Sequence, residues 1–118
     1  MLLARPAAAR IRTVLRDHAE VHAPEHLHVE CLSALRRYAL RGELSEARAA
    51  IALDALEKLR VLRYPVLEIR AQVWELRNAL GVYDAAYLAL ARRMDCRLLT
   101  TDAGLASVAR GEGRLAEL

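Results

Sequence analysis

Apolar residues recur at intervals of three and four along much of the chain, which predicts a series of amphipathic helices. The first stretch covers residues 4–16 and begins almost at the start of the sequence, and the second covers residues 25–40. A third stretch follows Ser45, whose hydroxyl is suited to capping a helix N-terminus. Residues 42–44 are therefore expected to form a tight connection between two antiparallel helices.

Three further helices are predicted in the second half of the chain. Residues 66–80 carry an apolar stripe, and Gly81 is expected to end that helix. Residues 85–94 are apolar nearly all round, which is typical of a helix buried inside a domain, and Asp84 is a suitable cap for it. Residues 103–109 predict a last short helix.

Short β-prone segments lie between these helices. Residues 21–24 end in a proline, residues 61–64 precede another, and residues 97–101 contain two consecutive leucines. Short strands that alternate with helices favour a parallel sheet with helices on its faces. The sequence therefore predicts an α/β fold, and its 118 residues suit a single domain.

Composition narrows the classes of protein that this chain can represent. A hydrophobic content of 55% is enough for a core and excludes wholesale disorder, and no apolar run is long enough for a bilayer. The net charge of +3 is compatible with a phosphate-bearing partner, although GC-rich coding also explains seventeen arginines beside one lysine, Lys58. Two isolated cysteines, Cys31 and Cys96, indicate buried thiols in a reducing cytoplasm, and a bridge between them stays an alternative.

Three acids stand in apolar surroundings. Glu30 lies beside the apolar face of the second helix, Asp84 precedes the most apolar helix, and Asp102 follows a predicted strand. Each has a plain explanation, because Asp84 and Asp102 suit helix caps and a surface position suits Glu30. Carboxylates gathered in a low-dielectric pocket repel one another, and a hard cation such as Mg²⁺ or Mn²⁺ removes that conflict. Thr100 and Thr101 are suited to support such a site with hydroxyl hydrogen bonds.

Residues 29–37 (VECLSALRR), 83–91 (YDAAYLALA) and 99–102 (LTTD) resemble three consecutive motifs of PIN domains, and more narrowly of VapC toxins. The resemblance implies a three-layer α/β/α fold with a short parallel sheet. It also implies a metal-dependent endoribonuclease of a toxin–antitoxin pair, with Glu30 and two aspartates, Asp84 and Asp102, as the acids that bind Mg²⁺ or Mn²⁺. A VapB-type antitoxin and a second copy of the chain are the implied partners, with RNA as substrate.

The sequence departs from this family at its start. PIN domains begin with a strand that ends in a metal-binding Asp, whereas this chain begins inside the first helix, and Asp17 lies at that helix's far end. We expect a single PIN-like domain over residues 1–118 that is N-terminally truncated by a start site placed too late. A gene remnant and completion by another chain are the alternatives. A catalytically inactive module that only binds an antitoxin or dimerises is the rival functional interpretation.

Other polar and aromatic residues allow further hypotheses. Arg36 and Arg37 share a helix with Glu30 and are the preferred candidates for RNA phosphate contacts. Tyr87 and the other aromatic residues suit RNA stacking, but core or dimer packing is expected for most of them. A zinc site is weighed against surface histidines, and the spacing favours the latter; its residues would be His22, His26, His28 and Cys31.

Overall fold

The computed structural model describes residues 20–116, and within them it has helices around a short parallel sheet. The α/β class predicted from the sequence is therefore confirmed. The predicted helix over residues 4–16 lies outside the described residues. In chain order the elements are β1 (His22–Pro24), α2 (Leu27–Leu40), α3 (Glu46–Lys58), β2 (Leu62–Tyr64), η1 (Val66–Ile69), α4 (Arg70–Glu75), α5 (Val82–Met94) and α6 (Ala103–Gly111).

Strands β1 and β2 pair in parallel, with His22 opposite Leu62, so both predicted strands are confirmed. The pairing continues one residue beyond β1, because the Glu25 amide donates a hydrogen bond to the Tyr64 carbonyl at 3.0 Å. The side chain of Glu25 also accepts a hydrogen bond from the Val66 amide. These contacts keep Glu25 out of the helix, and α2 therefore begins two residues later than predicted.

The strand predicted over residues 97–101 is wrong. Its only ladder contact within residues 20–116 is an isolated parallel bridge between Leu98 and Leu115. The Leu98 amide donates to the Arg114 carbonyl at 2.6 Å, and the Leu98 carbonyl accepts from the Ala116 amide at 2.9 Å. A strand needs a partner along its length, and this segment has one for a single residue.

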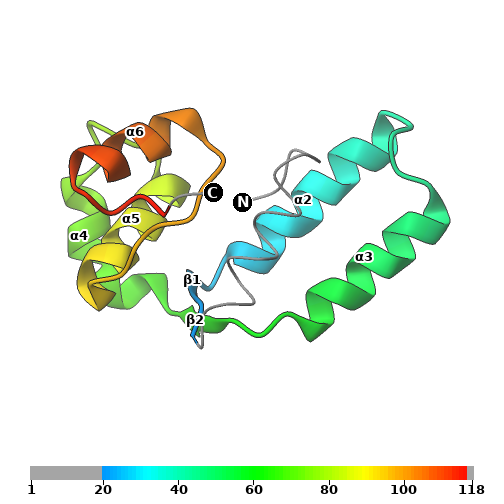
Figure 1. Ribbon diagram of the computed structural model, residues 1–118, viewed down its shortest axis with the longest axis horizontal. Helices are drawn as coiled ribbons and strands as arrows, with labels where there is room; N and C mark the ends of the chain where they lie inside the picture. The colour runs from blue at the N-terminus through cyan, green and yellow to red at the C-terminus, as the bar shows by residue number, and fades with distance from the viewer. Residues whose placement is uncertain (1–19, 117–118) are drawn as a thin grey trace.

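Helices α2 and α3 form an antiparallel arm on one side of the molecule, while α4, α5 and α6 lie on the other (Figure 1). The connection is tight, as predicted, and Gly42 turns the chain with a φ of +73°. The predicted cap is also confirmed, because the Ser45 hydroxyl accepts a hydrogen bond from the Arg48 amide at 3.2 Å. No residue of α3 is fully buried: Leu56 packs against the edge of the core, whereas Ile51 and Leu53 are 70% and 48% exposed.

The apolar residues of α2 form two rows of helical spacing, and only one row is buried. Leu27, Cys31 and Ala34 are buried, whereas Val29 and Leu32 are 67% and 46% exposed. Both rows have helical spacing, so periodicity alone does not decide which one faces the core. Because Leu27 and Ala34 are the neighbours of Glu30 one turn away, their burial places Glu30 at the edge of the core, as expected.

The helix predicted over residues 66–80 is shorter and is divided. A turn of 3₁₀ helix, η1, leads into α4, which ends at Glu75, and a series of turns follows. The apolar stripe nonetheless faces inward: Ile69, Val73 and Leu76 are buried. Tertiary packing therefore uses the predicted face while the local backbone changes its helix type.

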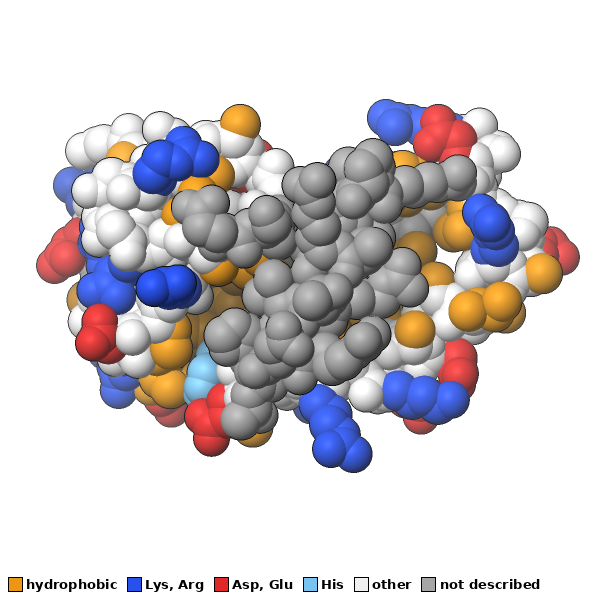
Figure 2. Space-filling model, in the orientation of Figure 1, with side chains coloured by type: hydrophobic (Ala, Val, Ile, Leu, Met, Phe, Trp, Pro, Cys, Tyr) orange, Lys and Arg blue, Asp and Glu red, His pale blue; other side chains and the backbone are white. Residues whose placement is uncertain are grey.

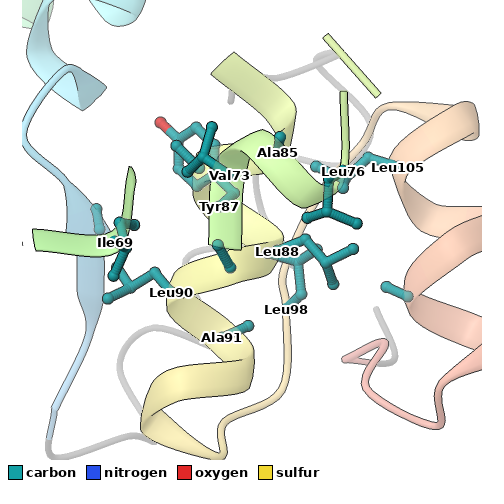
Figure 3. Close-up of a cluster of buried hydrophobic side chains, with 14 of the residues drawn as sticks. Ile69, Val73, Leu76, Ala85, Tyr87, Leu88, Leu90, Ala91, Leu98 and Leu105 are labelled. Carbon is teal, nitrogen blue, oxygen red and sulfur yellow. The ribbon is translucent and has the colours of Figure 1, made fainter. Parts of the chain in front are cut away.

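Helix α5 is the centre of the core, as its apolar sequence predicts. Seven consecutive residues, beginning at Ala85, are buried, and Leu88 is completely inaccessible to solvent. Figure 3 shows Leu88 gathered with Leu98 and with Leu105 of α6, while Ile69 meets the opposite side of α5. Cys31 is buried and Cys96 half-buried, and both are free thiols. In residues 20–116, no helix combines the length and apolarity that a membrane span requires.

Charged side chains fasten α6 to the end of α5. Arg92 donates two hydrogen bonds to Glu112, from Nε to Oε1 at 2.8 Å and from Nη2 to Oε2 at 2.6 Å. Arg114 lies 3.7 Å from the same carboxylate and 3.2 Å from Asp95. These ion pairs tie the C-terminal end of α6 to the end of α5.

Candidate metal centre

One cleft of about 650 Å³ brings together all three acids singled out from the sequence. Glu30 comes from α2, Asp84 from the first turn of α5, and Asp102 from the N-terminus of α6. The cleft also contains the side chains proposed to support the site, Thr100 and Thr101. Arg37 lines it as well, whereas Arg36 is exposed on α2 and is not among the lining residues.

Asp84 does not cap a helix, contrary to the sequence-based expectation. Helix α5 begins at Val82 after an extended Gly81, so Asp84 occupies the third helical position. No hydrogen bond to the Asp84 carboxylate is found among the described residues, although a negative charge in the first turn suits the helix dipole. The plain explanation for this acid is thereby removed, and its carboxylate faces a cleft with two other acids.

Asp102 does cap a helix. Its Oδ2 accepts a hydrogen bond from the Leu105 amide at 2.8 Å, at the start of α6. Its own amide donates to the Thr100 hydroxyl at 3.0 Å, which ties the residue to the preceding segment. A carboxylate has several acceptor positions, so capping through Oδ2 leaves Oδ1 for a ligand in the cleft. The residue is suited to both roles at once.

Glu30 is held from two sides. The Tyr87 hydroxyl donates a hydrogen bond to Glu30 Oε1 at 2.6 Å, and His26 Nε2 lies 3.4 Å from the same oxygen. The Glu30 side chain is only 26% exposed. The Tyr87 hydrogen bond joins α5 to α2 across 57 residues of sequence, whereas the His26 contact lies within the first turn of α2.

The three acids influence one another electrostatically. The pKa of Asp84 is raised above its usual range, chiefly because partial burial disfavours the charged form, and then because Asp102 and Glu30 repel it. His26 acts in the opposite direction. The pKa of Tyr87 is also raised, by burial first and then by its hydrogen bond to Glu30. A raised carboxylate pKa in a cleft with two other acids is typical of a functional site.

The donor set fits a hard divalent cation. Carboxylate and hydroxyl oxygens are the ligands that Mg²⁺ and Mn²⁺ prefer, and a cation would relieve the repulsion that Asp84 experiences. Within residues 20–116, however, no three His, Cys, Asp or Glu side chains already converge as a ligand set. The carboxylates therefore share the cleft and must close on a cation when it binds.

Sequence reasoning missed the way in which Tyr87 and His26 contact Glu30. Tyr87 was expected to pack in the core or a dimer, and its ring is indeed buried, but its hydroxyl reaches Glu30. A signal existed in the spacing. Tyr87 follows Asp84 by three residues and His26 precedes Glu30 by four, so each shares a helical face with an acid.

The sequence matches one family model and several known proteins. The family model described as "PIN domain" matches residues 1–111. The VapC ribonuclease Mb0985 of Mycobacterium bovis is 37% identical over 114 residues, which covers 90% of each chain. Ribonuclease VapC1 of Mycobacterium tuberculosis is 40% identical over 107 residues, covering 90% of this chain and 80% of the relative. Ribonuclease VapC12 of the same species is 33% identical over 106 residues, with 90% and 81% covered.

Proposed function

The chain belongs to the PIN domain family, and from that premise we propose that it is a metal-dependent endoribonuclease of the VapC toxin type. The relatives described above are named ribonucleases, and they match nearly the whole chain. We further propose that residues 1–118 form one such domain. Its substrate is RNA, and its cofactor is Mg²⁺ or Mn²⁺.

The observation that carries this proposal is the meeting of Glu30, Asp84 and Asp102 in one cleft. They come from three separate elements, and Asp84 has no capping role there. The raised pKa of Asp84 supports the proposal, because a site that repels its own carboxylate charges gains most from a cation. Asp84, Asp102 and Glu30 would hold that cation.

A bound cation of this kind supplies Lewis acidity at a phosphate and lowers the pKa of a water molecule. The chain's own residues do the remaining work. Arg37 lines the cleft and binds an RNA phosphate there. Arg36, on the same helix but outside the cleft, contacts the RNA backbone farther from the carboxylates. The hydroxyls of Thr100 and Thr101 line the cleft and form hydrogen bonds to its carboxylates or to water molecules at the cation. The carboxylates of the cleft assist proton transfer from the attacking water.

The protein partners in this proposal are a VapB-type antitoxin and a second copy of the chain. This part of the proposal is supported by the arm formed by α2 and α3, which exposes large apolar side chains. They include Leu40, which is 69% exposed, and Ile51, which is 70% exposed. Figure 2 shows hydrophobic side chains on the visible face of this arm. Exposed apolar side chains on neighbouring helices are typical of surfaces that bind a protein partner. We place the protein in the cytoplasm, which suits two free thiols.

An inactive module that only binds an antitoxin is the rival function. The relatives described above are all named as ribonucleases. The nuclease is therefore preferred.

Cleavage of a labelled RNA in the presence of Mn²⁺ tests the proposal. The wild-type chain is expected to cut, EDTA to stop the reaction, and Asp84→Asn to abolish it. Asp54→Asn is a matched control, because Asp54 lies on α3 and pairs with the exposed Lys58, away from the cleft. Cleavage by Asp84→Asn at the wild-type rate would refute the assignment, whereas no cleavage by any of the three proteins would favour the inactive module.

A further inference from the structure

Two side chains contact the same carboxylate oxygen of Glu30. The Tyr87 hydroxyl donates to Oε1 at 2.6 Å, and His26 Nε2 lies 3.4 Å from that same atom. No hydrogen bond to Oε2 is found among the described residues. One carboxylate oxygen is therefore committed to the protein, while the other remains for a ligand in the cleft that Glu30 and Tyr87 both line.

The donors themselves are held in place by packing. The Tyr87 ring is 9% exposed and belongs to the core around α5. The His26 ring makes edge contacts with Tyr83 and Tyr87, at centroid distances of 5.3 and 5.2 Å. Its Nε2 is buried, makes no hydrogen bond with a described residue, and lies 3.4 Å from Glu30 Oε1. Rotating Glu30 away would leave the Tyr87 hydroxyl without its hydrogen-bond partner.

Glu30 has a reason to rotate away. It repels Asp84, as Asp102 does, and the Glu30 side chain has three flexible torsions that allow it to swing into solvent. A hydrogen bond from an uncharged phenol opposes that movement without neutralising the carboxylate. An ordinary tyrosine has a pKa near 10, so its hydroxyl is a donor throughout the physiological range.

We propose that Tyr87 is a positioning residue for Glu30: its hydroxyl holds Oε1 and thereby keeps the carboxylate at the cleft, with Oε2 presented to the cation. His26 supports the same carboxylate from the α2 side. This proposal rests on the proposed function, since it assumes that Glu30 contributes to cation binding. Partners that orient a metal-binding side chain are worth 10- to 100-fold in metal affinity.

A double-mutant cycle on Mn²⁺ affinity, measured by calorimetry on the full chain, tests the proposal. Tyr87→Phe removes only the hydroxyl and keeps the ring in the core. It is combined with Glu30→Gln, and Tyr64→Phe serves as control, because Tyr64 lies in β2 beside Arg93 and does not line the cleft. Asp84→Asn establishes that the titrated site is the cleft. Circular dichroism confirms that each variant is folded, and the isosteric Phe makes that the expected result.

Tyr87→Phe is expected to weaken Mn²⁺ binding about tenfold, Tyr64→Phe to leave it unchanged, and Tyr87→Phe to have no further effect once Glu30→Gln is present. An equal loss in both backgrounds would show a merely structural role and overturn the proposal. Wild-type affinity in Tyr87→Phe, together with binding that Asp84→Asn abolishes, would overturn the positioning role alone. Absence of any Asp84-dependent binding would overturn the positioning role together with the proposed function.

Discussion

Asp102 offers a prediction that separates its two roles, because one oxygen caps α6 and the other is available to a cation. Asp102→Ala removes both the cap and the ligand. Loss of an N-cap with a 2.8 Å hydrogen bond to Leu105 costs about 1 kcal/mol of folding free energy. With an unfolding entropy of roughly 2 cal/mol/K per residue, that corresponds to a fall in Tm of about 4 °C for a chain of 118 residues.

Asp102→Asn separates the roles, because asparagine caps helices as well as aspartate does but lacks the charge that a cation needs. It is expected to keep at least the wild-type Tm in metal-free buffer, because the cap remains and the repulsion between Asp102 and Asp84 is removed, and to lose Mn²⁺ binding and RNA cleavage. Differential scanning calorimetry with EDTA, followed by Mn²⁺ titration of each variant, measures both effects. Equal Tm values for Asp102→Ala and the wild type would refute the capping argument, and wild-type Mn²⁺ affinity in Asp102→Asn would refute its role as a ligand.

Three further predictions follow from the core, an ion pair and the cleft. Leu88→Ala, at a completely buried position, is expected to lower the free energy of unfolding, measured in urea, by about 2–5 kcal/mol. Leu53→Ala, at a position 48% exposed, is expected to change it by no more than about 0.5 kcal/mol. Similar losses of unfolding free energy in the two variants would contradict the core assignment. The hydrogen bonds from Arg92 lower the pKa of Glu112 in the folded state. After solvent screening, they stabilise the folded state by about 0.5 kcal/mol. This stabilisation is fully present above the unfolded-state pKa of glutamate, near 4.3, and is lost as pH falls through the lower folded-state pKa. Glu112→Gln is therefore expected to be less stable than wild type at pH 7 and equal at the acid end, and a pH-independent difference would refute this. The raised pKa of Asp84 has the opposite effect on stability. Without metal, the wild type is expected to become less stable as pH rises through the folded-state pKa of Asp84. Asp84→Asn should therefore be more stable than the wild type at pH 7, and a destabilised variant would contradict this.

Local signals in the sequence predicted those parts of the fold that local interactions determine. Ser45 caps α3 as expected, and the strands before Pro24 and Pro65 form where the β-prone segments lie. The burial of α5 also followed directly from its composition. Errors appear where a distant contact decides the outcome. Residues near Leu98 have a β-prone sequence, but in the described part of the chain they find a partner at one position only.

The same distinction applies to the candidate site. Residue type and motif order selected Glu30, Asp84 and Asp102, and the fold brings them to one cleft. The sequence did not reveal that Gly81, and not Asp84, is the N-cap of α5. The start of α5 depends on where the preceding turns end, and the local sequence does not determine that point. Nor did it reveal the hydrogen bond from Tyr87: the spacing puts Tyr87 on the helical face of Asp84, but it does not identify a partner 57 residues away.

The central claim is that Glu30, Asp84 and Asp102 bind one divalent cation. Anomalous scattering from crystals soaked in Mn²⁺ tests it most directly. The account predicts a single strong anomalous peak in the cleft, at about 2.0–2.3 Å from oxygens of these carboxylates, and its disappearance in Asp84→Asn crystals. A peak bound by other residues, or an empty cleft at saturating Mn²⁺ with the carboxylates turned apart, would contradict it.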